Sequence, residues 1–266
     1  MREGSAETAA PRSDADRIVE ATRWIEEVTS TRTIAAPLGT ALYNDEFPVR
    51  YDSNFLRVEG SAGTTDATHV AAECAEHFDG FAHREVIVED ARRGAAMAPG
   101  FGELGWRVDR LLTMARRAEP DATPAVDGVA ELDLDDIVAF TREVHLRNFP
   151  GDAHRVADSL AAFSRVLHDR AGARFFGARV DGTVASACEL YVHRGAAQIE
   201  DVNTLEPFRG RGLARWVVSF AAREAEVAGA DLVWLIADDN DWPKELYAKL
   251  GFRSVGTFWQ FTLADD

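Results

Sequence analysis

The spacing of apolar residues divides the chain into two series of helices and strands. A first helix is predicted over residues 16–30, because Ile18, Ala21 and Ile25 recur at the spacing of one helical face. Clusters and alternations of β-branched and other apolar residues then predict short strands. In chain order, the first series continues with strands over 39–43 and 54–58, a helix over 67–78, and strands over 83–89 and 106–114 around a short helix.

The second series begins after a segment rich in proline and small residues. Pro120 and Pro124 lie there among charges and alanines, a composition typical of an inter-domain linker, and the boundary is placed near Pro120. Asp181 and Gly182 predict a type I′ hairpin between two of the later strands. The predicted elements are helices over 134–148 and 153–168, strands over 173–180, 183–193 and 197–204, a helix over 212–228, a strand over 232–237, a helix over 243–250 and a strand over 255–262.

This pattern predicts two α/β domains, which fits a length of 266 residues. Residues 1–15 are polar and lack periodicity, and we interpret them as a flexible leader. The prediction places an N-terminal domain over 16–119, a linker over 120–128 and a C-terminal domain over 129–266.

The two halves share a weak internal repeat. Residues 85–106 align with residues 231–252 without gaps, so that Phe101 corresponds to Tyr247 and Trp106 to Phe252. Chance similarity of two strand-helix units is the alternative explanation. If the repeat is real, the first half is a degraded copy of the second.

Charge and composition narrow the class of partner. A net charge of -16 and a pI near 4.9 disfavour nucleic acid and anionic membranes, and they favour cationic or neutral substrates. No apolar run approaches the roughly 20 residues that cross a bilayer, and no signal peptide is seen, so a cytoplasmic protein is predicted. Cys74 and Cys188 lack metal-site spacing and are interpreted as packing residues. The histidines, His145 among them, are interpreted as solvated or packing residues.

The strongest chemical signal is a glycine-rich turn, FRGRGLA, between a predicted strand and a predicted helix. The first N–H groups of a helix have no internal partners and carry about half a positive charge, which suits phosphate. Gly210 and Gly212 let the backbone approach, while Arg209 and Arg211 add charge-assisted hydrogen bonds. The turn is therefore predicted to bind pyrophosphate. Neither a dinucleotide-binding fingerprint nor a P-loop is present.

The spacing R-x-x-G-x-A formed by Arg209, Gly212 and Ala214 resembles the acyl-CoA pyrophosphate motif of the GNAT superfamily of N-acetyltransferases. Residues 202–204 precede the turn as the family's fourth strand does, and NDWPKELYAKLGF from Asn240 onward is similar to its N…LYxKLGF segment. The resemblance is clear over about residues 126–263. It implies the GNAT fold, an α/β fold with a mixed, mostly antiparallel sheet flanked by helices, in two related halves.

The resemblance also implies an activity and a set of contacts. Acetyl-CoA would be the co-substrate, and its acetyl group would pass by direct attack to an amine of a small molecule or peptide, without a metal. For Asn240, capping of the following helix is the alternative role. The implied acetyl-CoA contacts are Val202, Asn203, Thr204, Arg209, Gly210, Arg211, Gly212, Leu213, Ala214, Asn240 and Tyr247.

The candidate catalytic residues are Tyr247, Glu200 and Asp201. In similar enzymes a tyrosine at the place of Tyr247 protonates the leaving thiolate, and the alternative is a packing role. Glu200 and Asp201, and after them Glu189, are candidates for the base that deprotonates the amine; the alternative is a solvated strand residue or a partner of Arg194. Strand alternation predicts that Glu200 and Asp201 face opposite ways, unless a bulge intervenes.

Several alternatives stay open at the level of the sequence. A non-catalytic acyl-CoA-binding or interaction module would have the same turn but no base. Another acyl group, such as succinyl or malonyl, would need an arginine in the acyl pocket. The sequence also leaves open the identity of the amine, the role of the N-terminal half and the oligomeric state, for which a homodimer is one option.

Overall fold

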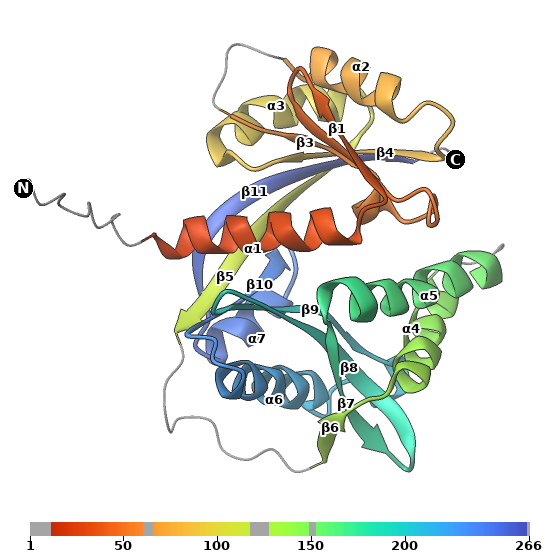
Figure 1. Cartoon of the computed structure of the whole chain (residues 1–266), viewed down its shortest axis with the longest axis vertical. Helices are drawn as coiled ribbons and strands as arrows, with labels where there is room; N and C mark the ends of the chain where they lie inside the picture. The colour runs from red at the N-terminus through yellow and green to blue at the C-terminus, as the bar shows by residue number, and fades with distance from the viewer. Residues whose placement is uncertain (1–11, 61–65, 118–127, 149–152, 265–266) are drawn as a thin grey trace, which may run out of the picture.

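In the computed structural model the strands of both halves join into one continuous sheet (Figure 1). The structure describes residues 12–60, 66–117, 128–148 and 153–264. The helices are α1 (Asp14–Thr29), α2 (Ala67–His77), α3 (Ala91–Glu103), α4 (Leu134–Asn148), α5 (Ala153–Ala171), α6 (Leu213–Val227) and α7 (Pro243–Lys249). The strands are β1 (Arg32–Ala36), β2 (Gly39–Tyr43), β3 (Phe55–Val58), β4 (His83–Val88), β5 (Arg107–Arg117), β6 (Val129–Glu131), β7 (Arg174–Val180), β8 (Thr183–His193), β9 (Ala196–Thr204), β10 (Leu232–Asp238) and β11 (Arg253–Ala264).

Most predicted elements are present, and the exceptions lie at the two edges of the sheet. The sequence pattern does not predict β1 or β6. β1 is almost wholly exposed and β6 has only three residues, so neither shows the alternation that burial of one face imposes. The predicted type I′ hairpin is confirmed, because Asp181 and Gly182 both have positive φ, at 51° and 84°.

Two predicted segments fall largely outside the described residues. These are residues 1–11 of the predicted leader and residues 118–127, which cover all but the last residue of the predicted linker. Helix α1 begins at Asp14, inside the predicted leader, because the Ser13 hydroxyl and the Asp16 carboxylate form a capping box.

The order of the strands is symmetric about the centre of the sheet. It reads β1-β2-β3-β4-β11-β5-β10-β9-β8-β7-β6, with β11 and β5 paired antiparallel in the middle. β11, the last strand of the chain, therefore lies between β4 and β5 of the first half. β5, the last strand of the first half, lies between β11 and β10. Each half thus completes its part of the sheet with a strand from the other half.

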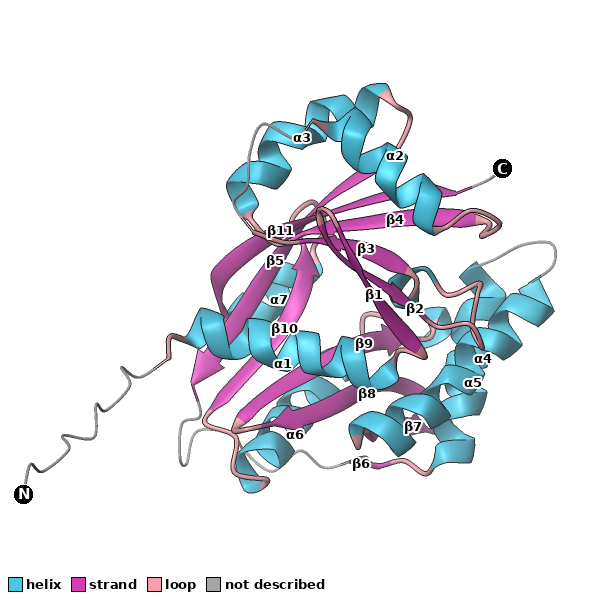
Figure 2. Cartoon of the chain, turned by 45° about the horizontal axis from the view of Figure 1, so that its top comes forward, coloured by secondary structure: helices cyan, strands magenta, loops and turns pink. Residues whose placement is uncertain are grey.

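The helices divide between the two faces of this sheet. On β5, Val108 packs with the core under α2 and α3, and Met114 packs with the core under α6 and α7. Residues an even number apart on one strand point to the same side, so these four helices cover one face. α4 and α5 cover the opposite face through a separate core that includes Tyr191 of β8. Figure 2 shows α1 lying across the central strands between the two halves.

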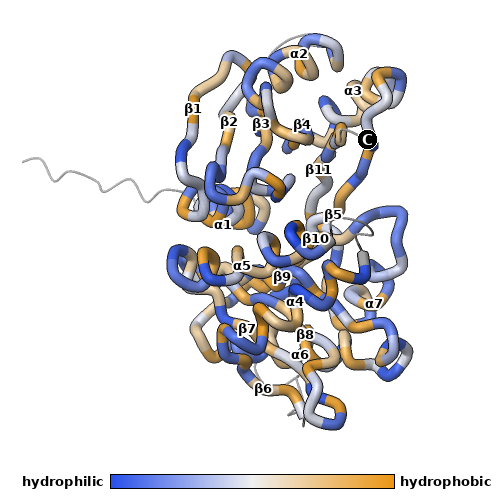
Figure 3. The backbone as a smooth tube through the Cα atoms, turned by 90° about the vertical axis from the view of Figure 1, so that its right-hand side faces the viewer, coloured by the Kyte–Doolittle hydropathy of each residue, from blue (hydrophilic) through white to orange (hydrophobic). Residues whose placement is uncertain are grey.

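The internal repeat is confirmed in three dimensions. β4 with α3 occupies the place in the first half that β10 with α7 occupies in the second. The Trp106 amide donates to the Phe101 carbonyl at 3.0 Å, and the Phe252 amide donates to the Tyr247 carbonyl at 3.1 Å. The ring pairs Phe101–Trp106 and Tyr247–Phe252 are both edge-on. The side view in Figure 3 shows the two halves joined through β11, β5 and β10.

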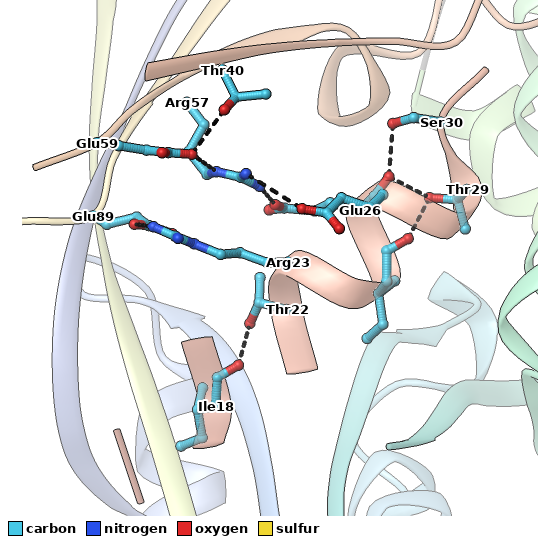
Figure 4. A network of polar contacts seen from close by, with 12 residues as sticks. Ile18, Thr22, Arg23, Glu26, Thr29, Ser30, Thr40, Arg57, Glu59 and Glu89 are labelled. Atoms are coloured by element: carbon cyan, nitrogen blue, oxygen red, sulfur yellow. Dashed lines mark hydrogen bonds and ion pairs between the residues drawn. The ribbon is translucent and has the colours of Figure 1, made fainter. Parts of the chain in front are cut away.

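A buried polar network fixes α1 to the first half (Figure 4). The Arg57 side chain is only 3% exposed, donates to the Glu26 carboxylate of α1, and donates to Glu59 at 2.9 Å. Arg23 of α1 pairs with Glu89 beside it. At its other end, α1 reaches the second half through Arg17, which bonds Asp231 in a bidentate ion pair. α1 is therefore bonded through ion pairs to both halves.

Candidate active site

The ladder between the parallel strands β9 and β10 ends early. The pairs run from Leu232 opposite Ala196 to Trp234 opposite Gln198, although β9 continues to Thr204 and β10 to Asp238. Within these two strands, which lie wholly inside the described residues, no β9–β10 pair follows Gln198. The backbone edge of β9 over Val202–Thr204 therefore has no ladder partner on its β10 side.

The first half has no such separation. Its parallel strands β3 and β4 stay paired to their ends, with Val58 opposite Val88. Of these two parallel pairs, which lie within the described residues, the β9–β10 pair opens and the β3–β4 pair does not.

The glycine-rich turn lies at the end of β9 where the ladder has ended. Gly210 and Gly212 have φ values of 76° and 78°, in the left-handed region that favours glycine. The Arg209 Nε atom donates to the Thr204 carbonyl at 3.2 Å, which ties the turn back to β9. The Arg211 guanidinium lies over the Phe208 ring. The residues from Arg209 to Gly212 are exposed, so their polar groups are open to a ligand.

The first turn of α6 is left without a cap. Gly212 stands at its N-cap position, and no side chain accepts from the first N–H groups. In the equivalent helix of the first half, α2, the Asp66 carboxylate accepts from the His69 amide at 2.9 Å. A negative charge therefore already occupies the N-terminus of α2, whereas the N-terminus of α6 offers its amides and its dipole to an anion.

Tyr247 lies buried at the end of α7, in the core between α6, α7 and the sheet. Burial and then the nearby charge of Glu200 raise the pKa of its phenol above the usual value, so the hydroxyl keeps its proton at neutral pH. Glu200 lies on β9, where β9 and β10 have separated, and its charge acts on the phenol. The structure thus brings together Tyr247 and one of the candidate bases.

A β-bulge in β9 changes the orientation of the candidate bases. The register against β8 shifts between Glu189 and Ala187, and Asp201 has a φ of +49°. Ile199 and Val202 both pack in the core beneath α6, so Glu200 and Asp201 between them project to the opposite face. Strict alternation therefore does not hold here, and the alternative of a bulge is what the structure shows, because β9 contains one extra residue.

Three carboxylates with raised pKa values gather on this face. Burial raises the pKa of Glu200 to about 7 and that of Glu189, directly opposite on β8, to about 8. Burial also raises the pKa of Asp201, although Asp201 and Glu200 keep some contact with solvent. Tyr191 donates to Glu189, and Asn203 donates to Asp201 at 2.6 Å. We call Glu189, Glu200 and Asp201 the carboxylate cluster.

Sequence reasoning missed three residues beside this cluster. Arg50 and Asp52 come from a loop of the first half, and His145 comes from α4, on which it is half-buried. Burial lowers the pKa of His145, while the charge of Asp201 opposes that shift. No spacing in the sequence links these segments, because only the packing of the two halves brings them together.

Asn240 lies on the exposed loop before α7. Its amide donates to the Asp238 carboxylate at 2.7 Å, and Trp242, not Asn240, occupies the N-cap position of α7. The capping alternative for Asn240 is therefore not what the structure shows, whereas its contact with acetyl-CoA stays a prediction.

The side chains and helices of the described residues also bear on metal binding and on membrane spanning. Among them, no group of three or more histidine, cysteine or acidic side chains is arranged to hold a metal ion. None of the helices in the described part of the chain is both long and apolar enough to cross a bilayer.

Comparison with known proteins agrees with this geometry. Residues 138–252 match the model of the acetyltransferase (GNAT) family. A conserved protein of unknown function from Staphylococcus epidermidis has a TM-score of 0.66 at 14% identity, over 90% of this chain and 96% of that one. A GCN5-related N-acetyltransferase from Kribbella flavida has a TM-score of 0.60 at 18% identity, over 95% and 96%. No curated protein sequence matches the chain.

A third similar structure has the doubled architecture. It is a tandem GNAT protein from the clavulanic acid biosynthesis pathway, with a TM-score of 0.51 at 14% identity, over 98% of this chain and 91% of that one. The fold is therefore the GNAT fold, present in two related halves. The family model matches residues 138–252, so the GNAT acetyltransferase domain lies in the second half.

Proposed function

We propose that the protein transfers the acetyl group of acetyl-CoA to an amine of a small molecule or peptide. The observation that carries the proposal is the early end of the β9–β10 ladder beside the uncapped N-terminus of α6. Unpaired strand amides suit the amide groups of a pantetheine arm, and an uncapped helix N-terminus suits a pyrophosphate. At the equivalent places in the described part of the first half, β3 and β4 stay paired and Asp66 caps α2.

The proposed contacts follow the shape of acetyl-CoA. The turn from Arg209 to Ala214, with Gly210, Arg211, Gly212 and Leu213 between them, would hold the pyrophosphate. The β9 edge over Val202–Thr204 would bind the pantetheine arm and supply an N–H donor to the thioester oxygen as negative charge develops there. Asn240 would contact the same arm.

The proposed reaction is direct attack of the amine on the thioester carbonyl. The carboxylate cluster would take a proton from the substrate ammonium, the C–N bond would form, and the C–S bond would break. Tyr247 would donate its proton to the departing sulfur, and the second proton of the attacking nitrogen would pass to the Tyr247 oxygen and restore the phenol. Of the cluster, Glu200 is our first choice as base, because a pKa of about 7 leaves much of it ionised at neutral pH yet basic enough to accept a proton. Asp201 is the second choice.

The first experiment measures acetyl-CoA binding by titration calorimetry. The intact protein should bind saturably, and Gly212→Asp should abolish binding, because it places a carboxylate where Asp66 caps α2 in the first half. Gly182→Asp is the matched control. Gly182 also has positive φ and free space around a new Cβ, but it lies in the β7–β8 hairpin. Absence of binding by the intact protein would refute the acetyl-CoA site.

The second experiment separates an enzyme from a non-catalytic binding module. Amines of several classes are incubated with acetyl-CoA and the protein, and acetylated product is measured by mass spectrometry. Tyr247→Phe should bind acetyl-CoA as the intact protein does but lower turnover by about 10²- to 10⁴-fold. Tight binding without product for any amine would favour the binding module. An acyl group other than acetyl would be revealed by turnover with succinyl-CoA or malonyl-CoA alone.

A further inference from the structure

A loop of the first half, residues 44–54, packs against the second half. The loop is fixed by Asn54, whose side chain accepts from the Asn44 amide at 2.8 Å and donates to the Phe47 carbonyl at 3.0 Å. The Phe47 ring packs edge-on against Phe163 of α5, with centroids 5.2 Å apart. The loop therefore presents its side chains to the second half from a rigid backbone.

Arg50 is the basic residue of this loop, and its guanidinium is held from several sides. It lies over the Phe163 ring, 4.2 Å from the ring centroid. Its Nε atom donates to the Ser53 hydroxyl at 3.1 Å, and its Nη2 atom donates to Asp52 at 2.8 Å. Its side chain is 21% exposed. A planar guanidinium stacked and bonded in this way has a defined position.

The charged groups that face Arg50 come from three elements of the second half as well as from its own loop. Burial disfavours its charge, but Asp52, Glu189 and Asp201 together keep the pKa of Arg50 above its usual value. In return, Arg50 lowers the pKa of Glu189 and of Asp201, and it also lowers that of His145 on α4. Tyr191 of β8 also interacts with Arg50. It packs in the same core as Phe163, the ring beneath the Arg50 guanidinium, and donates to Glu189.

We propose that Arg50 is a positioning residue through which the N-terminal half completes the active site of the C-terminal half. Its fixed cation lowers the pKa values of Glu189 and Asp201, which favours the ionised carboxylates that can receive a proton from the substrate. Without Arg50, repulsion between the negative charges of the clustered carboxylates would raise their pKa values further, and more of them would be protonated at neutral pH. This inference rests on the proposed function, in which the cluster contains the base.

The test compares Arg50→Met with Arg50→Lys, which keeps the charge. In Arg50→Met the acidic limb of the kcat/KM profile should move up by about one pH unit, the size of effect that one nearby opposite charge has. Arg50→Lys should restore most of the original profile. The matched control is Arg32→Met: Arg32 also stacks on a ring, that of Tyr43, and pairs with an aspartate, but it lies at the outer edge of the first half.

A second readout does not depend on turnover. The pKa of His145, followed by NMR and assigned with His145→Gln, should rise in Arg50→Met, because a neighbouring positive charge has been removed. If Arg50→Met does not fold, Arg50→Gln, which keeps hydrogen-bonding groups, replaces it. The inference would be overturned if Arg50→Met, or Arg50→Gln in its place, left both the acidic limb of the kcat/KM profile and the pKa of His145 unchanged. Absence of turnover by the intact protein would instead refute the proposed function.

Discussion

Glu200 has the ionisation that a base for ammonium substrates needs. A buried carboxyl with a pKa of about 7 accepts protons more readily than a solvent-exposed one, whose pKa is about 4.3. The same burial acts on Glu189 and Asp201, so the pH dependence of the reaction reports the cluster and not one group alone.

This ionisation gives a prediction for Glu200→Gln. In the intact protein, kcat/KM should rise with pH through about 7, as the cluster loses a proton, and then level off. Glu200→Gln should lower the plateau by about 10²- to 10⁴-fold. Glu103→Gln, on an exposed site of α3, is the control. If Glu200→Gln kept the plateau value of kcat/KM and the pH at which kcat/KM rises, the base would be Asp201 or Glu189.

Individual residues of the site differ in how far the sequence predicts them. The turn residues are predictable because glycine and arginine at fixed spacing have one strong local explanation. The orientation of Glu200 and Asp201 is not, because a bulge leaves no mark in the alternation of residues. Arg50 is invisible in the sequence for another reason, since its role depends on contacts with segments more than 90 residues away.

At the scale of elements, α1 depends on a buried ion pair. Glu26 lies in a site where burial raises its pKa to about 7, and Arg57 offsets part of that shift. A buried pair contributes little net stability, but removal of one partner leaves an uncompensated charge.

We therefore expect Arg57→Met to lower the free energy of unfolding by about 3–5 kcal/mol at pH 8.5. The loss should be smaller at pH 5.5. Because the pKa of Glu26 is higher in the folded than in the unfolded protein, the folded state takes up a proton there and removes the buried charge. Urea unfolding at both pH values measures this, with the exposed pair of Arg32 as control in Arg32→Met. An equal loss at both pH values would contradict the account.

The helices are predictable because each buries one side and so has a clear period, and strands such as β8 and β10 are predictable as short apolar runs buried on both faces. β1 and β6 are not, since edge strands with exposed faces have no such period. The order of strands in the sheet is beyond any local pattern. Nothing in the run of apolar residues in β11 indicates that it pairs with β4 and β5 instead of with β10.

At the scale of the whole molecule, the exchange of β5 and β11 governs how the chain can be divided. We propose that the two halves arose as copies of one domain, with the boundary between β5 and β6. We also propose that they now fold together as one cooperative unit. Each half lacks a central strand without the other, which exposes an unpaired edge and part of its core.

Fragments of the chain test this proposal. Residues 12–117 and residues 128–264, produced separately, should each fail to show a cooperative unfolding transition by circular dichroism. Mixed together, they should recover one transition, because each then receives its missing strand. A cooperative transition by either fragment alone would show that the halves fold independently.

The central position of β11 also concerns how the protein is made. Residues 253–264 leave the ribosome after all the other strands of the second half, yet they pair with β4, which was synthesised some 170 residues earlier. The first half therefore cannot complete its sheet while the second half is still being translated. During that time its apolar strand edges stay unpaired and exposed. We therefore expect the nascent chain to be a substrate for a chaperone that binds exposed strands.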